Sequence, residues 1–166
     1  MPAHHVLVPI DFSPDADYAL EYAMGLARIL QAKLTLLHVI EPLIGSVEAM
    51  PSTFLQDLED KITEAMLPYH ERVTAAGLAC DYTIVPGVPF QVIIDTARTA
   101  HIDLIIMGTH GRTGLRHVLL GSVAERVIRL APCPVLVVRL PPDMPAQTGQ
   151  GQGVLARETG QLGTLI

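Results

Sequence analysis

The sequence predicts an α/β fold, a doubly wound five-stranded parallel sheet with helices on both faces. Short apolar runs alternate with longer amphipathic segments in the order β-α-β-α-β-α-β-α-β, and such alternation gives parallel strands joined by right-handed crossovers. The apolar runs are hydrophobic at successive positions, which is typical of strands buried on both faces. A length of 166 residues without an internal repeat favours one domain with a tail.

The first predicted strand is the run HVLVPI at residues 5–10, which is rich in β-branched residues and is ended by Pro9. A helix is expected to follow it, because Ser13 is a good N-cap and Pro14 suits the first helical position. Apolar residues then recur at helical spacing on one face: Leu20, Ala23, Ala27 and Leu30.

The second predicted strand is KLTLLHVIE, residues 33–41, and a loop is expected over residues 42–51. A long helix should begin at Ser52. Its apolar stripe consists of Leu55, Leu58, Ile62, Met66, Tyr69 and Val73. Pro68 interrupts this stripe and predicts a kink or a break, and Gly77 is the expected stop.

The same alternation continues through three further strands and two further helices. The predicted strands are residues 78–87, 103–108 and 133–140, and the predicted helices are residues 89–102 and 121–131. After Leu140 the chain becomes rich in Gly, Gln and Pro without sustained periodicity. We therefore expect a globular domain over residues 1–140 and a tail over residues 141–166.

Composition excludes several classes of function. The formal net charge of −6 argues against a sequence-independent nucleic-acid binder, which needs a basic face. No apolar run approaches the roughly 20 residues that span a bilayer, so no membrane insertion is expected. The start MPAHHVLVPID has no basic region followed by a long apolar one. A cytoplasmic protein is the resulting expectation.

A ligand site is expected where three turns end at one edge of the sheet. In an open α/β sheet, ligands bind beyond the carboxyl ends of the strands, near the point where strand order reverses. The segments PIDFS (residues 9–13), HVIE (residues 38–41) and the stretch at residues 107–127 all follow strand ends. If the first strand lies between the second and the fourth, these turns meet in one cleft.

The stretch MGTHGRTGLRHVLLGSVAERV has the composition of an anion site. Gly108 and Gly111 allow sharp turns and close approach of backbone to a ligand. Gly121 and Ser122 open a helix, whose free amides and positive dipole end attract anions. No acidic residue occurs between residues 104 and 124, while Arg112 and Arg116 do. The alternative is a tight loop with an ordinary capping serine.

Two residues outside this stretch complete the candidate site. Asp11 could accept hydrogen bonds from a ribose or a base amine, and its alternative role is capping of the helix beside Ser13. Val39 would offer a base an apolar surface, and its alternative role is plain core packing. Of the seven histidines, His110 is the one expected to touch the ligand.

The segments VPIDFSPDADYALEYA, LTLLHVIEP and the region from GVPFQ to CPVLVV resemble the universal stress protein family over residues 3–140. The pattern Gly-x-x-Gly, nine residues, Gly-Ser is the hallmark of its ATP-binding branch and is complete here. The resemblance implies a nucleotide-binding domain at residues 1–140 with strand order 3-2-1-4-5. It also implies a homodimer paired through the fifth strand, from Val135 to Arg139.

The resemblance also implies a set of nucleotide-binding residues. The adenosine pocket would be lined by Pro9, Ile10 and Asp11, with Val39 against adenine. The ribose and phosphates would be surrounded by Met107, Gly108, His110, Gly111 and Arg112. The phosphates would also be held by Gly121, Ser122 and Val123. The expected ligand is ATP, with Mg²⁺ held mainly by phosphates and water.

These observations favour a binding and regulatory module over an enzyme. Phosphoryl transfer needs a metal held by carboxylates and a base that positions water. No Gly-Lys-Ser/Thr motif occurs, Asp103 lies at the opposite edge of the sheet, and His110 is the only credible base. We expect an ATP-sensing homodimer in the stress response, with the tail available to a protein partner. The alternatives are a binder of AMP or a cyclic nucleotide, and a slow nucleotide hydrolase.

Overall fold

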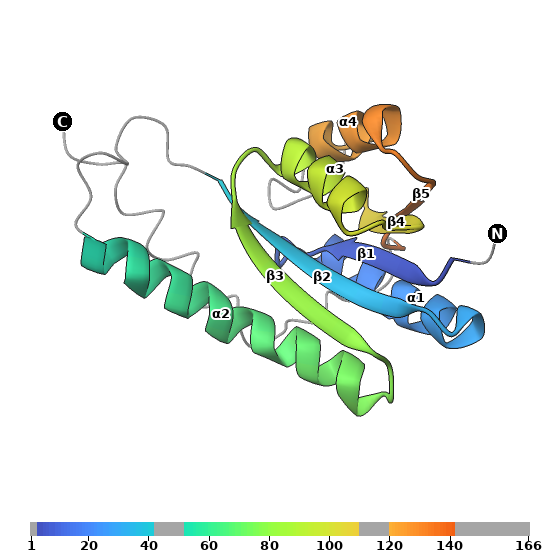
Figure 1. Cartoon of the computed structure of the whole chain (residues 1–166), viewed down its shortest axis with the longest axis horizontal. Helices are drawn as coiled ribbons and strands as arrows, with labels where there is room; N and C mark the ends of the chain where they lie inside the picture. Colours follow the sequence, from blue (N-terminus) through green and yellow to red (C-terminus); the bar gives the residue numbers. More distant parts are fainter. Residues whose placement is uncertain (1–2, 42–51, 110–119, 142–166) are drawn as a thin grey trace.

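The computed structural model describes residues 3–41, 52–109 and 120–141, and the strands and helices in these ranges follow the predicted order (Figure 1). The strands are β1 (His5–Pro9), β2 (Lys33–Ile40), β3 (Cys80–Pro86), β4 (Leu104–Gly108) and β5 (Val135–Val138). The helices are α1 (Pro14–Leu30), α2 (Ser52–Ala75), α3 (Pro89–Thr99) and α4 (Ser122–Leu130).

The strands form one parallel five-stranded sheet of order β3-β2-β1-β4-β5. The helices α1 and α2 lie on one face of the sheet, and α3 and α4 lie on the other (Figure 1). The predicted fold class is therefore confirmed. The central strand β1 is flanked by β2 and β4, so the carboxyl ends of these three strands lie together.

Two hydrophobic cores sandwich the sheet, and alternate residues of each strand enter opposite cores. In β1, Val6 and Val8 pack toward α1 and α2, while Leu7 packs toward α3 and α4. All three side chains are completely buried. Burial on both faces explains why the strands read as continuous apolar runs in the sequence.

The start of α1 has the predicted cap. Ser13 adopts an extended conformation, and its Oγ accepts a hydrogen bond from the Ala16 amide at 3.2 Å. Pro14 occupies the first turn, where its missing N–H has no intrahelical partner to lose. Gln31 caps the C-terminus of the helix and adopts the left-handed conformation with φ of 55°.

The helix α2 continues through Pro68, so of the kink or break expected there, the break does not occur. Met66 and Val73, on either side of the proline, are completely buried in the core beneath α1 and α2. This packing offsets the hydrogen bond that an interior proline removes. The chain turns at Gly77, as predicted, with φ of +76°.

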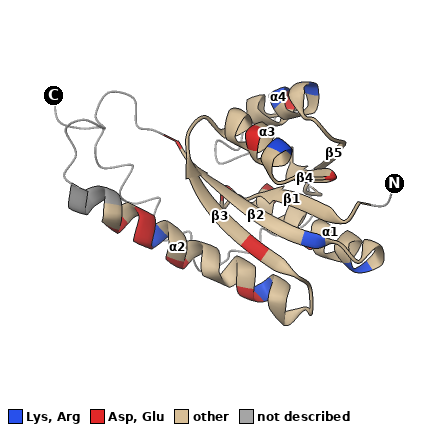
Figure 2. Ribbon diagram, viewed as in Figure 1, with Lys and Arg blue, Asp and Glu red and all other residues tan. Residues whose placement is uncertain are grey.

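Charged residues of both signs are interspersed along α2 (Figure 2). Arg72 reaches from this helix to α1, where its guanidinium lies 3.4 Å from the Glu21 carboxylate and 3.9 Å from the Asp17 carboxylate. These contacts link the two helices that cover one face of the sheet. Of the helices in the described ranges, none combines the length and apolarity needed to cross a bilayer.

Candidate functional site

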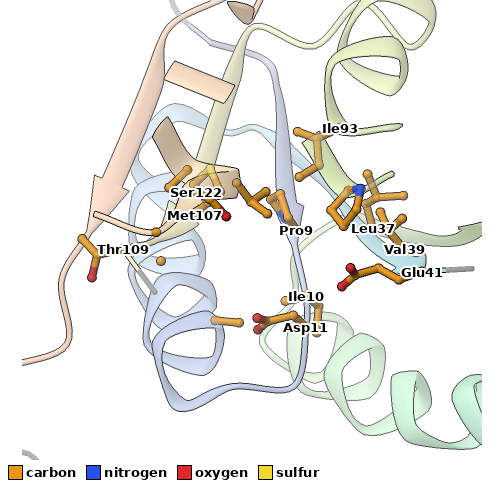
Figure 3. Close-up of a pocket in the computed structure, with 16 residues that line it drawn as sticks. Pro9, Ile10, Asp11, Leu37, Val39, Glu41, Ile93, Met107, Thr109 and Ser122 are labelled. Atoms are coloured by element: carbon orange, nitrogen blue, oxygen red, sulfur yellow. The ribbon is translucent and has the colours of Figure 1, made fainter. Parts of the chain in front are cut away.

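A cavity of about 260 Å³ opens at the carboxyl ends of β1, β2 and β4 (Figure 3). Its lining includes the following predicted site residues: Pro9, Ile10, Asp11, Val39, Met107, Gly108, Gly121, Ser122 and Val123. His110, Gly111 and Arg112 lie outside the described residues. The three turns that the sequence placed at one sheet edge do form one cavity.

One end of the cavity is formed by the start of α4, which a backbone hydrogen bond holds against the end of β4. The Gly121 amide donates to the Thr109 carbonyl at 2.8 Å. The first intrahelical bond runs from the Glu125 amide to the Gly121 carbonyl at 2.9 Å. The amides of residues 122–124 therefore have no intrahelical acceptor, and the helix dipole adds positive potential beside them.

This geometry refines the roles predicted for Gly121 and Ser122. The amide of Gly121 is already bonded to Thr109, so the amides after it are the ones free for a ligand. Ser122 is the first residue of α4, and Gly121 is the N-cap. The alternative in which Ser122 is an ordinary capping serine at the start of α4 is therefore wrong, because the N-cap position belongs to Gly121.

Gly108 lines the cavity, but its missing side chain also serves the packing of α1. A Cβ at this position would lie 2.8 Å from the Asp15 Cβ and 2.9 Å from the Asp15 backbone carbonyl carbon. Real Cβ atoms do not approach other atoms so closely. The sequence predicted that the missing side chain of Gly108 makes room for a ligand. On one side of Gly108, it makes room for helix α1.

The opposite end of the cavity has apolar walls. Leu37, Val39 and Ile93 line it, and each is at most 8% exposed (Figure 3). All three belong to the core between the sheet and α3 and α4, as does Met107, which lies beside Ser122 at the α4 end of the cavity. Val39 packs in the core and also lines the cavity, so the two positions considered for it as alternatives occur together.

Two carboxylates stand at the mouth of this apolar end, on Asp11 and Glu41 (Figure 3). Asp11 Oδ1 accepts hydrogen bonds from the Ser13 amide at 3.0 Å and from Ser13 Oγ at 2.5 Å. The helix-capping role considered for Asp11 therefore belongs to Ser13, and Asp11 Oδ1 holds that cap residue in place. Asp11 also lines the cavity, where its carboxylate can accept hydrogen bonds from a ligand's donors.

The turn that carries Asp11 is held by aromatic contacts. Phe12 adopts φ of 64°, a left-handed conformation that is uncommon for a residue with a side chain. Its ring lies 4.5 Å from the His38 ring and 5.8 Å from the Tyr69 ring. The His38 imidazole also bonds the Ile10 carbonyl through Nδ1 at 2.7 Å. These contacts fix the backbone on both sides of Asp11.

The two ends of the cavity differ in their electrostatic character. No lysine or arginine occurs among the described lining residues, and the start of α4 contributes positive potential at one end of the cavity. No group of three or more metal-ligating side chains occurs in the described parts of the chain. The arrangement suits an elongated ligand with an anionic end, an apolar planar part and hydrogen-bond donors.

Sequence reasoning did not assign several lining residues. They are Ala16, Leu37, Glu41, Pro89, Ile93, Thr109 and Ala124. Glu41 carried a signal, because it lies two positions after Val39 and so shares its face of the extended chain. Pro89 and Ile93 carried none, because the position of α3 over the cavity depends on tertiary packing.

The chain matches a known protein family over most of its length. The sequence profile of the universal stress protein family matches residues 2–139. Universal stress protein MJ0531 of Methanocaldococcus jannaschii is 34% identical over 139 residues, which cover 82% of each chain. Universal stress protein MJ0577 of the same organism is 34% identical over 151 residues, covering 81% of this chain and 93% of the relative.

Solved structures agree with these matches. The structure of MJ0577 has a TM-score of 0.73 and 35% identity, and the match covers 85% of this chain and 99% of that one. A universal stress protein crystallised in complex with cAMP has a TM-score of 0.66 and 26% identity. That match covers 83% of this chain and 98% of the other. The similarity therefore spans nearly the whole length of these relatives.

Proposed function

The chain belongs to the universal stress protein family, and on that premise we propose that it is a regulatory protein that binds ATP. The observation that carries the proposal is the hydrogen bond from the Gly121 amide to the Thr109 carbonyl. It brings the free amides of α4 to one end of a cavity whose other end is apolar. A phosphate chain at the amides would leave the base among the apolar walls.

Charge and hydrogen bonding support this orientation of the ligand. The amides of residues 122–124 and the helix dipole would bind phosphate oxygens. The carboxylates of Asp11 and Glu41 repel phosphate and accept hydrogen bonds from ribose hydroxyls or a base amine. A nucleotide bound the other way round would place phosphate against two carboxylates.

The choice of ATP among nucleotides rests on the sequence pattern that includes His110, Gly111 and Arg112. These residues would add contacts to the ribose and phosphates, with Mg²⁺ carried by the phosphates and water. A second candidate is AMP or a cyclic nucleotide, since a relative of 26% identity was crystallised with cAMP. Titration with each nucleotide distinguishes the candidates.

We propose a sensing role for the site rather than rapid catalysis. Within the described lining, the carboxylates stand at the end of the cavity away from the α4 amides, where they are poorly placed to activate water at a phosphate. The proposed homodimer would pair through Val135 to Arg139, because β5 is an edge strand of the sheet. Sedimentation with and without ATP tests this pairing.

Removing one amide hydrogen tests the phosphate position. Ser122→Pro deletes the first free N–H of α4, and proline suits the first helical position. The preceding Gly121 has φ of −70° and ψ of 152°, which a following proline tolerates. We expect ATP affinity, measured by calorimetry, to fall about tenfold.

Ser122→Ala is the matched control, because it removes the hydroxyl and keeps the amide. We expect it to weaken ATP binding less than Ser122→Pro does. Equal affinity of the proline variant and the wild type would place the phosphates elsewhere. Failure of the wild-type protein to bind any adenine nucleotide would refute the proposed function itself.

A further inference from the structure

Thr109 occupies a junction between four elements at the phosphate end of the cavity. It follows the last residue of β4, and it is 7% exposed. Its amide donates to the Val138 carbonyl of β5 at 3.1 Å, and its carbonyl accepts from the Gly121 amide at 2.8 Å. Its hydroxyl donates to Asp15 Oδ1 of α1 at 3.0 Å.

The contact between Thr109 and α1 is reinforced one residue earlier. The backbone of Asp15 fills the space where a Cβ of Gly108 would stand. The backbone of Asp15 therefore packs against residue 108, and its carboxylate bonds the side chain of residue 109. Both contacts hold the first turn of α1 against the end of β4.

We propose that Thr109 is a positioning residue for the nucleotide, acting through the carboxylate of Asp15. The Asp15–Thr109 hydrogen bond fixes the carbonyl to which Gly121 bonds, and that bond sets where the free amides of α4 begin. The hydroxyl proton points at Asp15, so it does not serve a phosphate oxygen. This inference rests on the proposed nucleotide site and assigns Thr109 and Asp15 a role in its affinity.

A direct-ligand role for the hydroxyl makes a different prediction about Asp15. If the Thr109 hydroxyl donated to phosphate, Asp15 would compete for the proton, and its removal would leave affinity unchanged or improve it. If the hydroxyl acts by positioning, removing either partner breaks the same link. Both single changes should then weaken binding, and the double change should weaken it by less than the two separate losses combined.

Variants of the full chain test this, with ATP affinity measured by calorimetry. Thr109→Val keeps the shape of the side chain and loses the hydroxyl, and Asp15→Ala removes the acceptor. We expect each to weaken ATP binding about fivefold, and the double variant to lose clearly less than the roughly 25-fold that two independent effects would give. Thr109→Ser and Asp15→Asn retain a donor and an acceptor, and both should bind within about twofold of wild type.

Thr35→Val controls for the loss of a buried threonine hydroxyl. Thr35 is 8% exposed, and its Oγ1 bonds His5 Nε2 at 2.8 Å near the amino ends of the strands, away from the cavity. This variant should lose stability in urea without losing ATP affinity. A purely structural role of Thr109 would give the same pattern, with ATP affinity unchanged.

The outcomes separate the two proposals. Wild-type binding of ATP with unchanged affinity in Thr109→Val and Asp15→Ala overturns the positioning role and leaves the proposed function standing. If Thr109→Val weakens ATP binding and Asp15→Ala does not, the positioning role is overturned, and the Thr109 hydroxyl contacts the nucleotide directly. Absence of ATP binding by the wild type overturns both. If Thr109→Val does not fold, the positioning role is decided by Asp15→Ala, which must bind ATP more weakly than Asp15→Asn does.

Discussion

Gly108 has no room for a side chain, because the first turn of α1 lies against it. Gly108→Ala would place a Cβ 2.8 Å from the Asp15 Cβ and 2.9 Å from backbone atoms of Asp15. The backbone of a helix yields less readily than a flexible side chain, so α1 must shift. We expect a loss of about 1–3 kcal/mol in the free energy of unfolding, measured in urea.

Gly25 is the matched control for this substitution. It lies on the exposed side of α1, and nothing stands within 4 Å of a Cβ built there. Gly25→Ala should stabilise the protein by up to about 1 kcal/mol, because alanine has the higher helix propensity. Equal effects at both glycines would show that the contact with Asp15 carries no energetic weight.

Asp103 links the start of the chain to the sheet and makes stability depend on pH. Its Oδ2 accepts hydrogen bonds from the amides of His4 and His5, each at 2.9 Å. These bonds lower the pKa of the carboxyl below its ordinary value of 3.8. The stabilisation is therefore complete above about pH 4 to 5 and is lost as the pH falls through the lowered pKa.

Asp103→Asn should reduce the thermal midpoint at pH 7, and the difference from wild type should shrink toward pH 3. Thermal unfolding followed by circular dichroism between these pH values measures the trend. Asp95→Asn is the control, because Asp95 pairs with the exposed Arg98 at 3.5 Å, a kind of contact with little effect. If the difference in thermal midpoint between wild type and Asp103→Asn stayed constant down to pH 3, the Asp103 carboxylate would not be the source of the pH dependence.

At the scale of the element, α2 tolerates a proline that local rules would exclude. Pro68 is exposed, while Met66 and Val73 are completely buried. Pro68→Ala restores an N–H to the helix interior and opens no cavity in the core. Because the proline also restricts the unfolded chain, we expect a net gain of about 1–2 kcal/mol in urea unfolding. A loss of stability would mean that the helix depends on the shape of the proline.

The elements were predictable from sequence wherever local signals and packing agree. The cap at Ser13 and Pro14 and the turn at Gly77 lie where their chemistry placed them. Of the kink or break predicted at Pro68, the break was wrong, because the burial of Met66 and Val73 overrides a local preference. The left-handed conformation of Phe12 had no signal in the sequence, since it depends on rings from β2 and α2.

At the scale of the whole molecule, the site follows from strand order. Once β1 lies between β2 and β4, the turns after these strands must converge, so the sequence located most of the cavity lining. The family resemblance supplied that order; alternation alone left it open. Thr109 and Ile93 were missed because their roles arise from contacts between elements that are distant in sequence.

The proposed boundary between domain and tail predicts the effect of truncation. The last strand ends at Val138, and the family match ends at residue 139. A protein that ends at residue 141 should keep the thermal midpoint and the ATP affinity of the full chain. Calorimetric titration and thermal unfolding of both proteins measure this. A lower midpoint or weaker binding would show that residues 142–166 contribute to the domain.

The walls of the cavity are also parts of the hydrophobic core, and this sharing constrains how the protein can diversify. Leu37, Val39, Ile93 and Met107 serve both purposes. A smaller side chain at any of them enlarges the cavity and at the same time removes core packing. New ligand preferences should therefore arise only in lineages that first acquire surplus stability elsewhere, or through the turns that bear Asp11 and Glu41.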